Sequence, residues 1–130
     1  MALRISRRLA DAIRAQANAA VPLECCGLLL GAGDEVSAIA PAANVAADPA
    51  HRFEIDPMIL LAAHKAARGS GPAILGCYHS HPVGDPVPSV TDAAMAEGRG
   101  EYWLIVGNEG LLRGWRAVGG GDFEAIQLLE

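Results

Sequence analysis

The sequence predicts a single α/β domain in which helices flank one mixed β-sheet. Short apolar segments bounded by glycine or proline alternate with segments of helical periodicity. Some neighbouring strand segments are joined by short turns, and such hairpins indicate that the sheet contains antiparallel as well as parallel pairs. The chain has 130 residues, of which 52% are hydrophobic and 19% are charged, so it can bury a real core and is too apolar to be disordered. We therefore expect residues 1–130 to form one domain.

The N-terminal half is expected to contain two helices and several short strands. Apolar residues recur at helical spacing after Ser6, which predicts a helix that Ser6 caps and that runs to about Ala20. Asp56 followed by Pro57 is typical of a helix start, and this second helix is expected to run to about Arg68. The segment 41–49 has the composition of a surface loop. Strands are expected at 3–5, 23–31, 36–40 and 52–55.

The C-terminal half is expected to contain one short helix and further strands. An apolar strand at 72–78 leads directly into a segment with two histidines. A proline-rich loop follows, and a helix is expected to run from Ser89 to about Glu97. The segments 102–106 and 111–118 should form a hairpin around the turn at 107–110, and 123–129 should form a last strand.

Charge, apolar runs and cysteines exclude several classes of protein. The formal net charge of −5 argues against sequence-independent binding of nucleic acid, which needs clustered basic residues. The longest apolar runs are too short to cross a membrane, and no signal peptide is visible, so we expect no membrane partner and a cytoplasmic location. Cys25, Cys26 and Cys77 are an odd set without C-x-x-C spacing, which predicts reduced thiols.

A metal site is predicted where the strand at 72–78 ends. His79 and His81 lie two residues apart, and side chains at i and i+2 leave the same face of a strand, so both imidazoles can reach one ion. Ser89 and Asp92 have the S-x-x-D spacing of a helix capping box, and Asp92 can also supply a carboxylate ligand. Two histidines and one acid, with a further position left open, are typical of a catalytic zinc site.

The identity of the third ligand and the role of one acid stay open at this level. From spacing alone, Asp85 competes with Asp92, although Asp92 has the stiffer mounting. Glu24 lies at the mouth of an apolar strand, where a carboxylate is costly to bury unless it is paired or used. Alternatively, Glu24 lies at a strand end that faces solvent and has no functional role, and the sequence favours neither interpretation.

The remaining histidines and aromatic residues are given structural interpretations. His64 is expected at the edge of the core and His51 in solvent. Cys77 shares a strand face with the two metal-site histidines and is expected to pack beneath the ion. Trp103 and Trp115 are expected in the core or on the sheet surface.

These motifs together resemble a known family. His79-Ser80-His81-Pro82, six residues and then Ser89-Val90-Thr91-Asp92 resembles the signature of JAMM metalloproteases, the catalytic branch of the MPN domains. The segment 22–31, with Glu24 before a Cys-Gly pair and an apolar strand, is similar to the element that carries the family's glutamate. The segments around Asn44 and 53–57 are similar to small prokaryotic members, so the resemblance covers nearly the whole chain.

The resemblance implies a cytidine-deaminase-like fold and a zinc-dependent peptidase or isopeptidase. It implies His79, His81 and Asp92 as ligands of Zn²⁺ and so selects Asp92 as the third ligand. Glu24 would act as general base and Ser89 would stabilise the oxyanion. The chain lacks both the H-x-E and P-C-x-x-C motifs of nucleobase deaminases and the H-E-x-x-H motif of zincins, so we expect neither activity.

The resemblance also implies a class of substrate. Small prokaryotic members of the family act on ubiquitin-like sulfur-carrier proteins and cleave after a C-terminal diglycine. We therefore expect such a carrier as the protein partner. The alternatives are a non-catalytic MPN-like scaffold or interaction domain, and a JAMM peptidase that acts on unrelated peptides. A scaffold would not need Glu24 together with the complete ligand set, which this chain retains.

Overall fold

The computed structural model describes all 130 residues and contains three helices and seven strands. The helices are α1 (Arg7–Ala20), α2 (Pro57–Arg68) and α3 (Val90–Met95). The strands are β1 (Ala2–Ile5), β2 (Cys26–Ala32), β3 (Glu35–Ala42), β4 (Ala73–Ser80), β5 (Tyr102–Val106), β6 (Leu112–Gly119) and β7 (Asp122–Leu129). Ser6 caps α1 and Asp56 caps α2, as predicted, because each side chain accepts a hydrogen bond from a backbone N–H of the first turn.

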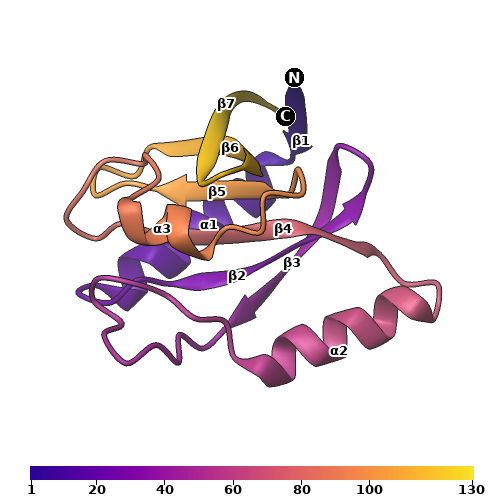
Figure 1. Cartoon of the computed structure of the whole chain (residues 1–130), viewed down its shortest axis with the longest axis horizontal. Coiled ribbons are helices and arrows are strands. Elements are labelled where there is room, and N and C mark those ends of the chain that lie inside the picture. The colour runs from indigo at the N-terminus through magenta and orange to yellow at the C-terminus, as the bar shows by residue number, and fades with distance from the viewer.

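All seven strands belong to one sheet, which closes on itself in the order β1-β3-β2-β4-β5-β6-β7. The prediction of a mixed sheet is confirmed: β4 is parallel to β5, β1 is parallel to both neighbours, and the other pairs are antiparallel. The closure goes beyond the prediction. It depends on β1, which pairs with β3 on one side and with β7 on the other. Figure 1 shows both chain termini at this joint.

The core lies on both sides of β2, β4 and β5. Helix α1 covers one side, where Ile13 packs with Leu29, Tyr78 and Leu104. Because neighbouring residues of a strand point to opposite sides, Trp103, the neighbour of Leu104, belongs to a second, smaller core. That second cluster consists of Cys26, Phe53, Trp103 and Ala117. It supports the end of β4 that carries the two histidines.

The prediction of a strand at 52–55 is wrong. Only an isolated bridge joins Ile55 to Asn44 there. The side chain of Asn44 accepts a hydrogen bond from the Glu54 N–H and donates one to the Arg52 carbonyl. A side chain that binds backbone groups in this way replaces the strand partner that a ladder would need.

The prediction that His64 lies at the edge of the core is also wrong. His64 is exposed, and no residue of α2 is buried. Met58 and Leu61 of the same helix are 69% and 61% exposed. Figure 1 shows α2 standing away from the sheet. Helical periodicity identifies the apolar side of a helix but not how closely that helix packs.

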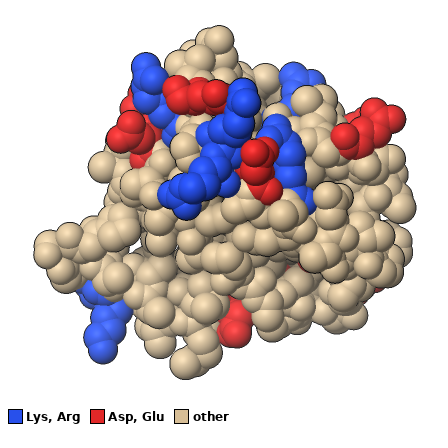
Figure 2. Space-filling model, turned by 180° about the vertical axis from the view of Figure 1, so that it is seen from behind, with Lys and Arg blue, Asp and Glu red and all other residues tan.

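The surface carries charges of both signs. Figure 2 shows acidic and basic side chains next to one another on the side opposite the view of Figure 1. Ion pairs join Arg7 to Glu130 and Arg14 to Asp11. None of the helices has both the length and the hydropathy that crossing a bilayer requires.

Candidate metal centre

Strand pairing brings Glu24 to the two histidines. Cys26 is paired with His79 in the antiparallel β2–β4 ladder. Continuing that register by two residues places Glu24 opposite His81, and residues opposite one another in such a ladder share a face. The end of β4 and the residues that precede β2 therefore meet at one edge of the sheet, although they are far apart in the sequence.

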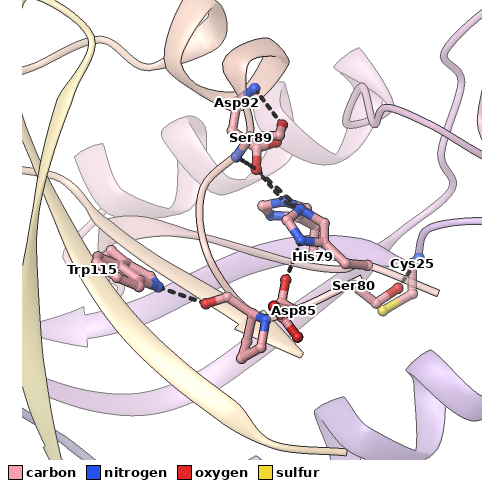
Figure 3. A network of polar contacts seen from close by, with 9 residues as sticks. Cys25, His79, Ser80, Asp85, Ser89, Asp92 and Trp115 are labelled. Atoms are coloured by element: carbon pink, nitrogen blue, oxygen red, sulfur yellow. Dashed lines mark hydrogen bonds and ion pairs between the residues drawn. The ribbon is translucent and has the colours of Figure 1, made fainter. Parts of the chain in front are cut away.

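His79, His81 and Asp92 come together at one point. The Nε2 atoms of His79 and His81 are 3.2 Å apart, and each is 3.1 Å from Oδ2 of Asp92. Figure 3 shows Asp92 in the first turn of α3 and Ser89 just before it, above the imidazoles. One ligand atom from each of the three residues lies within 4.8 Å of the other two. The structure thus brings Asp92 to the histidines.

The spacing and chemistry of these atoms fit a divalent metal ion. In a tetrahedral zinc site with bonds of about 2.0–2.1 Å, two ligand atoms lie about 3.3–3.4 Å apart. The observed separations of 3.1–3.2 Å are close to that edge. His79 is fully buried and Asp92 is nearly so, whereas the His81 side chain is 13% exposed. A cation among the three would compensate the buried carboxylate, and solvent reaches the site from the His81 side.

Asp92 is both a capping residue and a member of this cluster. The Ser89 side chain accepts the Asp92 N–H at 3.0 Å, and Oδ2 of Asp92 accepts the Ser89 N–H at 2.9 Å. These two bonds complete the capping box of α3. The helix start therefore fixes the carboxylate that faces the imidazoles.

The pKa shifts of His79 and Asp92 suit metal binding, whereas the shift of His81 means that an ion must displace a proton from its imidazole. Burial lowers the pKa of His79, which favours the neutral imidazole that ligation requires. Burial also opposes ionisation of Asp92, but hydrogen bonds from both imidazoles and from the Ser89 N–H outweigh it, so the pKa of Asp92 falls below its ordinary value. For His81, hydrogen bonds to Asp92 and to the Asp85 carbonyl outweigh burial and raise the pKa.

Glu24 is buried beside this cluster. Its side chain is 6% exposed, and Oε1 has no hydrogen-bond partner, which excludes the solvent-facing alternative. Burial raises the pKa of Glu24 to about 7, while the nearby charges of His81 and Asp92 oppose each other. The next residue, Cys25, is held by a 2.9 Å hydrogen bond from its N–H to the Ser80 hydroxyl (Figure 3). A carboxylate with such a pKa can accept and release a proton near neutral pH.

Asp85 joins the site through its backbone and not through its carboxylate. Its carbonyl oxygen is 2.7 Å from Nδ1 of His81, whereas its side chain is exposed. Trp115 donates its indole N–H to the Pro86 carbonyl at 3.0 Å, which holds the same loop from the β6 side (Figure 3). Sequence reasoning did not identify this role of Trp115, because a tryptophan in a strand carries no signal for a loop contact.

The ring of Phe53 lies against His79. The ring centroids are 4.4 Å apart and the planes differ by 22°, so the rings are stacked. Trp103 meets the same imidazole edge-on, at 5.6 Å and 88°. Cys77 lies in the same cluster and is only partly buried. Sequence reasoning did not single out Phe53, since its contact with His79 forms only in three dimensions.

Comparison with known proteins agrees with the sequence motifs. The family model that describes prokaryotic homologs of the JAB domain matches residues 6–118. A desampylase from Haloferax volcanii is 42% identical over 91 residues, which make up 68% of this chain and 66% of that protein. A probable TtuB-protein conjugate cleaving protease from Thermus thermophilus is 36% identical over 111 residues, 85% of this chain and 74% of that protein. The aligned part thus spans slightly less than two thirds of the desampylase.

A solved structure has the same fold over nearly the whole chain. A protein from Desulfitobacterium hafniense, determined in solution, superimposes with a TM-score of 0.83 at 27% sequence identity. The superposition covers 99% of this chain and 92% of that protein. The strand and helix order described above is therefore shared by a protein of known structure.

Proposed function

The chain belongs to the family of prokaryotic JAB-domain proteins, and we propose that it is a zinc-dependent peptidase or isopeptidase that cleaves conjugates of a ubiquitin-like protein. One observation carries the proposal: two imidazole nitrogens and a carboxylate oxygen lie 3.1–3.2 Å apart beside a buried glutamate. The names of two relatives, a desampylase and a TtuB-protein conjugate cleaving protease, support the substrate class. Residues 1–130 would form one catalytic domain of cytidine-deaminase-like fold, and a cytoplasmic location stays a prediction.

We propose that the cleaved bond follows a C-terminal diglycine of the ubiquitin-like protein. A groove of about 400 Å³ lies between α2 and α3, and Phe53 and Trp103, which contact His79, are among its lining residues. Leu60 and Met95 line it from the two helices. The groove meets the proposed site only through Phe53 and Trp103, since neither Glu24 nor the three proposed ligands line it. A tail that ends in glycine could approach the buried site closely, because glycine has no Cβ to collide with its walls.

His79, His81 and Asp92 would hold the metal ion. Zn²⁺, when bound, would act as a Lewis acid towards water and the scissile carbonyl. Glu24 would accept the proton of the attacking water and pass it to the leaving amine. Its burial, which raises its pKa in the metal-free protein, favours holding that proton. Its unpartnered Oε1 leaves a lone pair free for that proton.

Ser89 would stabilise the negative charge that develops on the carbonyl oxygen. Its hydroxyl oxygen accepts the Asp92 N–H, so its own O–H remains available as a donor. The residue is exposed at the start of α3, beside the carboxylate that faces the imidazoles. A donor held by a helix cap is fixed before the reaction, as stabilisation of an oxyanion requires.

Cleavage of a defined conjugate tests the proposal. Purified protein is incubated with a diglycine-ended ubiquitin-like carrier fused through an amide bond to a peptide, and cleavage is followed by mass spectrometry. We expect cleavage after the diglycine that a chelator abolishes and Zn²⁺ restores. Glu24→Gln should retain the metal and lose about 100- to 10,000-fold in rate, the usual contribution of general base catalysis.

Glu35→Gln is the matched control, because Glu35 is an exposed acid on β3. This variant should cleave at the wild-type rate. Equal rates for the Glu24→Gln variant and the wild type would contradict the role of Glu24 as general base. Cleavage of unrelated peptides but not of the carrier fusion would overturn the proposed substrate. If neither chelator nor Zn²⁺ changes the cleavage of any fusion, the proposed metal-dependent enzyme is overturned.

A further inference from the structure

The two imidazoles of the proposed metal centre are held in different ways. Nδ1 of His81 forms a hydrogen bond of 2.7 Å with the Asp85 carbonyl oxygen. Nδ1 of His79 is buried and has no hydrogen-bond partner. Metal-binding histidines normally donate this second N–H to an acceptor, which fixes the orientation of the ring. The orientation of His79 must therefore be fixed by other contacts.

Two aromatic rings enclose the imidazole of His79. Phe53 is stacked on it at 4.4 Å, and Trp103 meets both rings edge-on, each at a centroid distance of 5.6 Å. Phe53 is 4% exposed and Trp103 is 3% exposed. Two buried rings on two sides of the imidazole restrict its rotation.

Asn44 holds Phe53 in this position. Its side-chain N–H groups donate to the carbonyls of Glu24 and Arg52, both at 3.0 Å, and its carbonyl accepts the Glu54 N–H at 3.1 Å. The residues on both sides of Phe53 are thereby bound to one side chain. The same side chain also donates to the backbone carbonyl of Glu24. It therefore links the segment that contains Phe53 to the segment that carries the proposed base.

We propose that Phe53 is a positioning residue for the metal centre. Its ring, held in place by Asn44, keeps the imidazole of His79 in the orientation in which Nε2 faces His81 and Asp92. Phe53 is not one of the proposed ligands and acts on the metal ion through its contact with His79. The proposal rests on the metal centre proposed above and adds to it the contact that replaces the missing hydrogen bond at Nδ1.

The affinity of the protein for Zn²⁺, measured by competition with a chromophoric chelator, tests this proposal without any assay of activity. Phe53→Leu keeps an apolar side chain but removes the stacked ring. We expect it to weaken Zn²⁺ binding about 3- to 10-fold, the size of effect that an aromatic pair contributes. Phe53→Tyr keeps a six-membered aromatic ring at this position and is expected to retain most of the affinity.

Phe123→Leu is the matched control. Phe123 meets Trp103 edge-on at 5.4 Å in the same cluster, but it makes no ring contact with His79. This variant should bind Zn²⁺ as tightly as the wild type. Equal affinity of Phe53→Leu and wild type, or equal weakening by both leucine variants, would overturn the positioning role. A wild-type protein that binds no Zn²⁺ would instead overturn the metal centre itself.

A measurement on the wild-type protein remains available if Phe53→Leu does not fold. In the NMR spectrum of the metal-free protein, the carbon-bound ring protons of His79 should be shifted upfield by the ring current of Phe53, unlike those of exposed His64. An unshifted His79 spectrum would contradict the proposal.

Discussion

Asp92 shows how one carboxylate can serve a helix and a metal site. Its Oδ2 accepts the Ser89 N–H and also faces both imidazoles. The S-x-x-D spacing therefore has two interpretations. The capping box is confirmed, and metal ligation by the same carboxylate stays a proposal. The capping box stiffens the carboxylate because two reciprocal hydrogen bonds hold it in the first turn of α3.

The raised pKa of Glu24 predicts how the stability of the folded protein depends on pH. The folded protein raises its pKa from an ordinary value of 4.5 to about 7. Below pH 4.5 the residue is protonated in both the folded and the unfolded state and does not reduce stability. Between pH 4.5 and 7 the unfolded chain releases the proton first, so the folded state loses stability as the pH rises, and the full cost is present above pH 7.

Glu24→Gln should therefore stabilise the metal-free protein at pH 8 but not at pH 4. At about 1.4 kcal/mol per pKa unit, the gain at pH 8 approaches about 3 kcal/mol. Urea unfolding of both proteins, with chelator present, measures the difference at each pH. Exposed Glu35 serves again as the control, since Glu35→Gln should change stability little at either pH. A gain that does not depend on pH would contradict the linkage.

The loop between β4 and α3 is held at several points. The His81 N–H donates to the Val106 carbonyl, the Gly84 N–H to the His81 carbonyl, and the Asn108 N–H to the Gly84 carbonyl. Trp115 adds the contact to Pro86. These bonds place the Asp85 carbonyl against His81, which explains how a loop rich in proline and glycine can orient a histidine.

Trp115→Phe should loosen this loop. The variant keeps an aromatic ring in β6 but loses the N–H that binds the Pro86 carbonyl. We expect amide hydrogen exchange at Gly84 and Asn108 to speed up about fivefold, which corresponds to about 1 kcal/mol for one hydrogen bond. Asp85→Asn is the control, because it retains the carbonyl that His81 uses. Unchanged exchange in Trp115→Phe would show that the other bonds hold the loop alone.

At the scale of the whole molecule, the proposed site joins segments that are distant in the sequence. Its residues come from the start of β2, the end of β4 and the start of α3. A metal ion bound there would connect the end of β4 to the start of α3 through its three ligands, and it would bind the folded state alone. Metal binding should therefore appear as stability of the entire domain.

Zn²⁺ at 100 times its dissociation constant should stabilise the folded domain by about 2.7 kcal/mol. For a domain of this size we expect a rise in melting temperature of about 8–12 °C, which a chelator should reverse. Calorimetry of the wild type with and without Zn²⁺ measures the shift. Asp92→Asn should show no shift, whereas Asp85→Asn should show the full shift. An equal response of the two variants would contradict the assignment of Asp92.

The sequence alone predicted the three helices, the strands of the sheet and the histidine pair, because these depend on local chemistry, although it also predicted a strand at 52–55 that the structure lacks. Ser6, Asp56 and Ser89 cap helices through their own first turns, and period-2 alternation puts His79 and His81 on one strand face. Only the tertiary structure decided which side chains surround them. The closure of the sheet through β1, the exposure of His64 and the stacking of Phe53 on His79 depend on contacts between distant segments. Such contacts are fixed by packing in three dimensions, and a periodic pattern along the chain does not encode them.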